Sequence, residues 1–361
     1  MRVSIRVASA TLLSLILVAV TVLAQRGAGS PAAGAAVRPA EATTRIVASA
    51  QALLTTLDAA GRMKVQFPFE GSQKTRWSNL PSGIFERRGL RLGDLTRPQR
   101  GAVMVLLSTA LSRPGYQKVT EIMRGDEVLR QTAAANGPGR GGGRGSPPGG
   151  AVTFGEGEYY LAFLGTPSTT EPWMLQFGGH HLAINLMLGA SQASMTPSLP
   201  AAQPASYTVE GRTIRPLGGE NDKGFALINA LDNTQRGQAI LSYRVADLVL
   251  GPGQDGRTIQ PEGIRATALT PSQQTMLLDL VREWAGIMTD AYAEPRMAEI
   301  RANLPQTYFA WSGPTASGSA AYFRIQGPTL VIEYAPQGGV DHIHTIYRDP
   351  TNDYGAKIAR R

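Results

Sequence analysis

The chain has 361 residues, a formal net charge of +8 and no cysteine. The lack of cysteine excludes disulfide bonds, thiolate metal ligands and the lipid-attachment cysteine of bacterial lipoproteins. Four arginines lie in a predicted leader or in a glycine-rich tract, and subtracting them leaves a mild excess of about +4. No run of basic residues with interleaved aromatic residues is present, so we expect no nucleic-acid binding.

The first 24 residues have the order of a secretory signal peptide. Arg2 and Arg6 precede an apolar run over residues 8–23, which ends in small residues. The run is short for a bilayer-spanning helix, so we predict cleavage, a periplasmic or secreted location and no stable membrane span afterwards. Residues 25–40 are rich in Gly, Ala and Pro without periodicity, which predicts a flexible linker.

Three helices are expected in the first part of the folded chain. Apolar residues recur at helical spacing over residues 46–57. A second helix is indicated by Thr96 as N-cap and by Pro98 in the first turn. The sequence Arg-Pro-Gly at 113–115 predicts a break, and a third helix is expected to follow to about Gln131.

Strands dominate the second part, after a Gly/Arg/Pro-rich tract at 136–150 that we expect to be a disordered loop. The clearest helix follows Thr270, where Gln273 can complete a capping box, and a shorter one is predicted over 233–244. Aromatic and aliphatic runs between Gly and Pro predict strands at 158–165, 173–188, 308–311, 321–326, 329–334 and 342–347.

This order predicts an α+β fold. Helix and strand runs are segregated, which favours a mainly antiparallel sheet with helices packed on one side, a helical N-terminal part and a strand-rich C-terminal part. We expect residues 41–357 to form a single domain.

The four histidines fall into two pairs, His180-His181 and His342-x-His344, each expected within a strand. Side chains alternate along a strand, so His342 and His344 share a face and only one of the first pair can join them. Such a cluster predicts a site for a divalent transition metal, either zinc, copper or iron. The alternative is that these histidines fill a half-buried face and only form hydrogen bonds.

Further polar residues are candidates for the same site. Glu158 is our candidate general base, and Arg348 could bind an anionic group with two hydrogen bonds. Asp349 or Asp353 could orient an imidazole. The polar run from Arg348 to Gly355 is equally compatible with a simple Asx-turn.

Several motifs in the same order resemble the family known as domain of unknown function 3500 (DUF3500). The resemblance spans about residues 45–357 and implies a single family-length domain and an exported location, but no activity. Its motifs include Arg76-Trp77, Glu158-Tyr-Tyr, Trp173-x-x-x-Phe-Gly-Gly-His-His-Leu, Tyr322-Phe-Arg-Ile-x-Gly-Pro and His342-Ile-His-x-x-x-Arg-Asp-Pro-x-Asn-Asp-Tyr-Gly.

Three classes of function follow. The first is a metal-dependent hydrolase in which the ion acidifies a water molecule, or a copper or iron oxidoreductase with the same ligands. The second is a non-catalytic periplasmic ligand-binding protein with an aromatic cleft. The third is a cell-envelope interaction module. The sequence does not identify the substrate, whether a small molecule or a polymer.

Overall fold

The computed structural model describes residues 37–135 and 152–359. The predicted signal peptide and the tract at 136–150 therefore lie outside the described residues, as does most of the predicted linker. The first helix begins at Pro39, two residues inside that linker. None of the described helices is long and apolar enough to cross a membrane.

Helices form mainly where the sequence places N-caps and apolar stripes. Thr96 and Thr270 cap α3 and α7, each with a reciprocal hydrogen bond from a glutamine three residues later. The helices are α1 Pro39–Thr55, α2 Ala59–Val65, α3 Arg97–Ala110, α4 Arg113–Ala135, α5 Gly218–Ala230, α6 Asn233–Ala239, α7 Pro271–Ala285 and α8 Asp290–Ala302.

The strands form two large sheets and one small hairpin. The first sheet has the order β1-β3-β4-β5-β6, with β2 paired to β3 and β7 paired to β5. Its strands are β1 Gln66–Phe67, β2 Leu90–Arg91, β3 Tyr160–Leu164, β4 Trp173–Gly179, β5 Leu182–Gly189, β6 Gln192–Ser194 and β7 Leu199–Pro200. It is antiparallel except where β1 pairs with β3.

The second sheet is an antiparallel meander in chain order, β10-β11-β12-β13-β14. Its strands are β10 Ile264–Arg265, β11 Tyr308–Ser312, β12 Tyr322–Gly327, β13 Leu330–Pro336 and β14 Ile343–Arg348. The small hairpin consists of β8 Tyr207–Val209 and β9 Arg212–Ile214.

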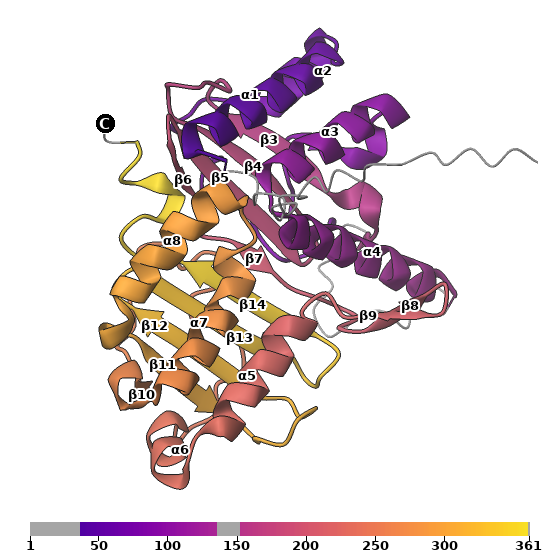
Figure 1. Ribbon diagram of the computed structural model, residues 1–361. Helices are drawn as coiled ribbons and strands as arrows, with labels where there is room; N and C mark the ends of the chain where they lie inside the picture. The colour runs from indigo at the N-terminus through magenta and orange to yellow at the C-terminus, as the bar shows by residue number, and fades with distance from the viewer. Residues whose placement is uncertain (1–36, 136–151, 360–361) are drawn as a thin grey trace, which may run out of the picture. The chain divides into compact units, whose positions relative to one another are not determined.

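The segment around β7 joins the two sheets (Figure 1). Pro200 pairs with Leu182 of β5 on one side. On the other side, Ser198 and Ala202 form β-bridges with Tyr347 and Ile343 of β14. The start of β14 and the start of β5 are thereby brought to opposite sides of one short segment.

Helices cover one face of each sheet (Figure 1). The apolar core of the first sheet packs α1, α3 and the start of α4 against side chains such as Trp173 and Phe177. The core of the second sheet packs α5 and α7 against Phe309, Trp311 and Phe323. The predicted α+β class, with helices on one side of mainly antiparallel sheets, is confirmed.

Several details differ from the sequence-based expectation. The run 173–188 is two strands, β4 and β5, and His180-His181 form the turn between them instead of lying within a strand. Helix α4 begins at Arg113, because the proline sits in its first turn where no backbone donor is needed. Helix α8, which contains Pro295 in its interior, was not predicted from the sequence.

Candidate metal centre

The turn between β4 and β5 presents two histidines at the end of the first sheet. Gly179 pairs with Leu182, so His180 and His181 are the only residues in the turn. His181 has a φ of 60°, in the left-handed region that ordinary side chains rarely adopt. Its amide donates to the carbonyl oxygen of Asn79, and its carbonyl oxygen accepts from Ala201. These two backbone hydrogen bonds fix the position of the His181 ring.

The other two histidines stand at the start of β14. His342 directly precedes the strand and His344 is its second residue, so both side chains point away from the helices. Ile343 between them packs into the core of the second sheet. Strand alternation therefore places the two imidazoles on one face, as expected.

The Nε2 atoms of His181, His342 and His344 converge. The Nε2 atom of His342 is 2.9 Å from that of His181 and 2.9 Å from that of His344. Nitrogen ligands on a tetrahedral zinc ion would be about 3.3 Å apart, given Zn–N bonds of about 2.0 Å. The three ring nitrogens lie within 4.8 Å of one another, so this His triad could hold a metal ion after small ring movements.

The outer contacts of His344 favour the tautomer that binds metals. Its Nδ1 atom lies 3.2 Å from Oδ1 of Asp247, and its Nε2 atom lies 3.2 Å from Nδ2 of Asn79. A carboxylate at Nδ1 accepts a hydrogen bond from the ring N–H, which keeps the proton on Nδ1 and leaves the lone pair on Nε2. Asp247 is itself fixed by hydrogen bonds from Gln337 at 2.7 Å and from its neighbouring backbone amide.

The surroundings keep the imidazoles of His181 and His342 uncharged. Burial and then the neighbouring His180 hold the pKa of His181 well below its ordinary value. Burial and then His344 lower the pKa of His342 to about 4. Burial opposes ionisation of Asp247, but the hydrogen bonds from His344 and from the Leu248 amide together with the nearby histidines outweigh it, and the pKa of Asp247 is lowered. A neutral imidazole has the free lone pair that coordinates a cation.

His180 is directed away from the triad centre. Its ring stacks on that of His181 at 3.7 Å between centroids, and its Nδ1 atom is 2.7 Å from Oδ1 of Asp126. The other oxygen of Asp126 accepts from the Gly155 amide at 2.7 Å. His180 and Asp126 are both buried, at 5% and 2% exposure. Their contact therefore helps to fix the position of the turn.

Glu158 makes its contacts elsewhere. It ends a short 3-10 helix, and its Oε1 atom lies 2.5 Å from Nη2 of Arg91. Burial alone would raise the pKa of Glu158, but the hydrogen bonds from Arg91 and Ser82 together with the charge of Arg91 outweigh burial and lower it. A carboxylate with a lowered pKa and a cationic partner is a weak base.

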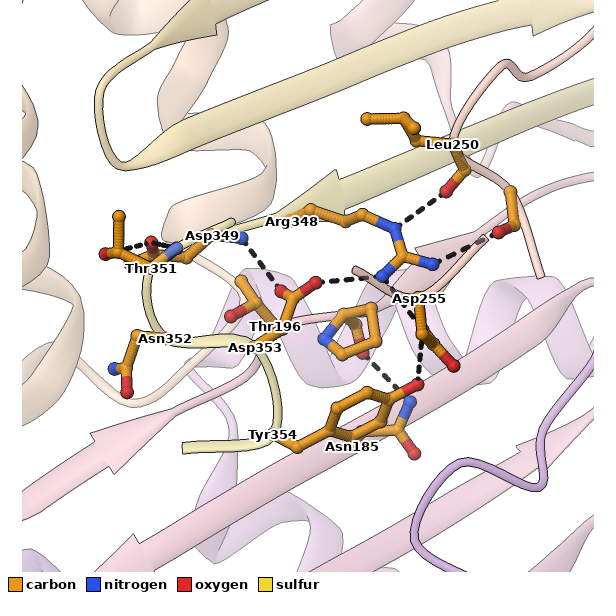
Figure 2. A network of polar contacts seen from close by, with 12 residues as sticks. Asn185, Thr196, Leu250, Asp255, Arg348, Asp349, Thr351, Asn352, Asp353 and Tyr354 are labelled. Atoms are coloured by element: carbon orange, nitrogen blue, oxygen red, sulfur yellow. Dashed lines mark hydrogen bonds and ion pairs between the residues drawn. The ribbon is translucent and has the colours of Figure 1, made fainter. Parts of the chain in front are cut away.

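Arg348 and Asp349 are also engaged within the chain (Figure 2). Arg348 is 2% exposed and donates to two carboxylates, those of Asp255 at 3.0 Å and Asp353 at 2.8 Å. It also donates to the carbonyl oxygens of Leu250 and Gly251. These contacts leave Arg348 little capacity to bind a further anion.

Asp349 has partners that differ from those of Arg348. One of its oxygens accepts from the amide and hydroxyl of Thr351, and the other lies 3.1 Å from Arg296. The structure thus brings together His181, His342 and His344 and gives Glu158, Arg348 and Asp349 other partners.

Two residues of the site were not found from the sequence. Asn79 and Asp247 lie in irregular segments more than 90 residues from the histidines they contact. Neither forms part of a short-range motif. The Ser-Asn-Leu sequence after Trp77 carries only a generic turn signal.

The fold and the site together define an α+β protein with a largely buried three-histidine group where its two sheets meet. The family model described as "Protein of unknown function (DUF3500)" matches residues 39–356. The chain belongs to this family, which confirms the resemblance seen in its motifs. Comparison with curated proteins and with solved structures gave no match.

Proposed function

We propose that this chain is an exported metal-binding protein, and that it is a metal-dependent hydrolase. His181, His342 and His344 would hold one divalent transition-metal ion. The observation that supports this is the convergence of three Nε2 atoms from two segments about 160 residues apart in the chain. A group of three imidazoles with a carboxylate behind one of them matches the preferences of zinc, copper and iron.

The ligand set favours hydrolysis over a purely structural role for the ion. Three protein ligands on a tetrahedral ion leave one position free, whereas structural zinc sites use four protein ligands. When bound, the ion would supply a Lewis acid that acidifies a water molecule. The side chain of His342 is only partly buried, so this ligand is in contact with solvent. Export is inferred from the N-terminal sequence alone.

The first experiment is elemental analysis of the tag-free mature protein by inductively coupled plasma mass spectrometry. We expect near-stoichiometric zinc, copper or iron in the wild type and none in the His342→Ala/His344→Ala variant. Asp222→Asn is the control, since it changes an exposed ion pair outside the triad, and it should retain the metal. If the wild type holds no metal after incubation with each ion and desalting, the proposal of a metal centre is refuted.

The identity of the metal directs the second experiment. A zinc protein would be tested on chromogenic esters, phosphoesters and amides, with turnover expected in the wild type and lost in His344→Ala. A copper or iron protein would be tested for oxygen consumption, and activity there without hydrolysis would replace the hydrolase with an oxidoreductase.

A further inference from the structure

Asn79 contacts the metal centre at a nitrogen that an ion would use. Its side-chain Nδ2 atom is 3.2 Å from Nε2 of His344. Within the described part of the chain, this is the one polar contact of the Asn79 amide. The two nitrogens of the His344 ring therefore have different neighbours, Asp247 at Nδ1 and Asn79 at Nε2.

The Asp247 carboxylate sets the direction of the hydrogen bond between Asn79 and His344. An ionised carboxylate can only accept, so the ring proton of His344 stays on Nδ1, 3.2 Å from Oδ1 of Asp247. Nε2 of His344 then carries a lone pair and can only accept as well. The amide oxygen of Asn79 would be repelled by that lone pair, so the NH₂ group must face it. In the metal-free centre, Asn79 therefore donates to Nε2 of His344.

His342 is the other group that could donate to this lone pair, since its Nε2 atom is 2.9 Å from that of His344. The same atom of His342 is also 2.9 Å from Nε2 of His181. A neutral imidazole has at most one proton on this nitrogen, and one N–H group serves one ring nitrogen well. Asn79 has no second acceptor among the described residues, so its NH₂ group stays directed at His344 in either case.

The backbone around Asn79 is held to the histidine turn. Nη2 of Arg87 donates to the carbonyl oxygens of the residues on either side of Asn79, at 2.8 and 2.6 Å, and to that of Gly179 at 2.7 Å. The carbonyl oxygen of Asn79 accepts from the amide of His181. These backbone contacts present the Asn79 side chain to His344, and a substitution of the side chain leaves them in place.

We propose that Asn79 regulates the metal centre by competing with the ion for Nε2 of His344. The proposal rests on the proposed metal centre and deepens it. The ion can bind this nitrogen only after the Asn79 NH₂ group has turned away, because both need the same lone pair and a cation repels the N–H hydrogen. Asp247 and Asn79 thus act on one ring with opposite effects. Asp247 strengthens metal binding, whereas Asn79 weakens it and keeps the empty centre ordered.

The test is competition for Zn²⁺ between the protein and a chromophoric chelator. We expect Asn79→Ala to bind zinc about two- to tenfold more tightly than the wild type, the factor that corresponds to one ordinary hydrogen bond. Asn79→Asp should bind more tightly still, because it adds a negative charge and has no N–H group. Asn229→Ala is the control, since it removes an amide that donates to the carbonyl oxygens of Phe225 and Thr315, and it should bind zinc as the wild type does.

Weaker or unchanged zinc binding by Asn79→Ala would overturn the proposal, because a fourth ligand or a structural support would weaken binding when removed. If neither the wild type nor Asn79→Ala binds zinc, copper or iron, the metal centre itself is refuted, and this proposal with it. The two failures are therefore distinguishable.

A second measurement needs no variant. Two-dimensional NMR spectra that correlate ring protons with ring nitrogens can resolve the four histidines of the chain. In the metal-free wild type, we expect His344 to carry its proton on Nδ1 and none on Nε2. A proton on Nε2 of His344 would overturn the proposal, because the Asn79 amide could not then donate to that nitrogen.

Discussion

His181 combines a ligand position with an unfavourable backbone conformation. Its φ of 60° is one that glycine adopts freely, yet the turn carries a histidine there. Backbone strain of this kind persists where the surroundings hold it, and here Asn79 and Ala201 bind the peptide groups on both sides. The strained backbone directs the imidazole toward β14, and a relaxed turn would not.

Replacing His181 should therefore separate backbone strain from ligand loss. In chelator-treated protein, we expect His181→Gly to be about 1 kcal/mol more stable than His181→Ala, because alanine keeps the cost of positive φ. Urea denaturation measures the difference. At His344, in a β-strand, the order should reverse, and the same order at both positions would contradict the strain argument.

Asp247 acts on the metal centre through His344. We expect Asp247→Asn to weaken metal affinity about 10- to 100-fold, the usual effect of losing a carboxylate behind a ligating histidine. Competition with a chromophoric chelator measures this affinity. Asp222→Asn, which removes a carboxylate from an exposed ion pair with Arg215, is the control and should leave the affinity unchanged. Equal affinities for Asp247→Asn and the wild type would show that the contact has no role in binding.

At the scale of elements, the helix-free face of the second sheet is polar and is covered by the irregular segment 241–263. Side chains of the strands hold the backbone of this segment, for example Glu333, whose two oxygens accept from the amides of Val249 and Leu250. Arg324 is buried and pairs with Glu262 at 2.8 Å. Because the segment carries Asp247, these anchors also position the carboxylate behind His344.

The anchor at Glu262 should respond to acid. Hydrogen bonds from Tyr243 and then from Arg324 lower the pKa of Glu262 below its ordinary value of 4.5. A lowered pKa means that the stabilisation is present above about pH 4.5 and is lost as the pH falls through the value in the folded protein. We expect lower protection from hydrogen exchange in 241–263 below that pH, measured relative to the intrinsic exchange rate at each pH. The decrease should be modest, since Glu262 is partly exposed.

Glu262→Gln should lower the protection of this segment from hydrogen exchange to the same extent at pH 7. Glu294→Gln removes a comparable carboxylate from an exposed pair with Arg282 on α7 and should leave exchange in 241–263 unchanged. Constant protection of this segment across the pH range would mean that the backbone contacts alone hold the segment in place.

At the scale of the whole molecule, a buried ionic group connects helices that cover different sheets. Lys118 of α4 contacts the carboxylates of Glu220 on α5 and Glu283 on α7. Glu220 is fully buried and Lys118 is 9% exposed. The group therefore connects the helical layer over the first sheet with the layer over the second, as the β7 segment does for the sheets.

Removing the cation should destabilise the whole fold. Lys118→Met leaves Glu220 buried without its counter-charge, and we expect a loss of about 3 kcal/mol in the free energy of unfolding. Chemical denaturation checks the value. The double variant Lys118→Met/Glu220→Leu should recover most of the lost stability, because the charge of Glu220 is then removed and Glu283 keeps its ion pair with Lys223. A neutral effect of the single variant would mean that Glu220 is protonated in the folded protein.

The sequence alone determined the α+β class, the starts of α3 and α7 and the regions of the longer strands, because these depend on local signals. The seven described strands of two or three residues were not predicted. Capping residues and apolar periodicity act within a few neighbours, so Thr96 and Thr270 begin their helices where expected. The pairing of His342 with His344 also follows from strand alternation alone. The family followed from motifs spread over the whole chain and was confirmed.

Only the tertiary structure decided which groups meet at the site. The two-residue turn at His180-His181 was not predicted, because no glycine occupies its left-handed position. Asn79 and Asp247 reach His344 from distant irregular segments, and no local pattern encodes such contacts. The partners of Glu158 and Arg348 were equally unpredictable, since an ionised side chain pairs with whichever opposite charge or carbonyl the fold brings near. Local chemistry sets the elements, whereas long-range packing chooses the neighbours of each polar group.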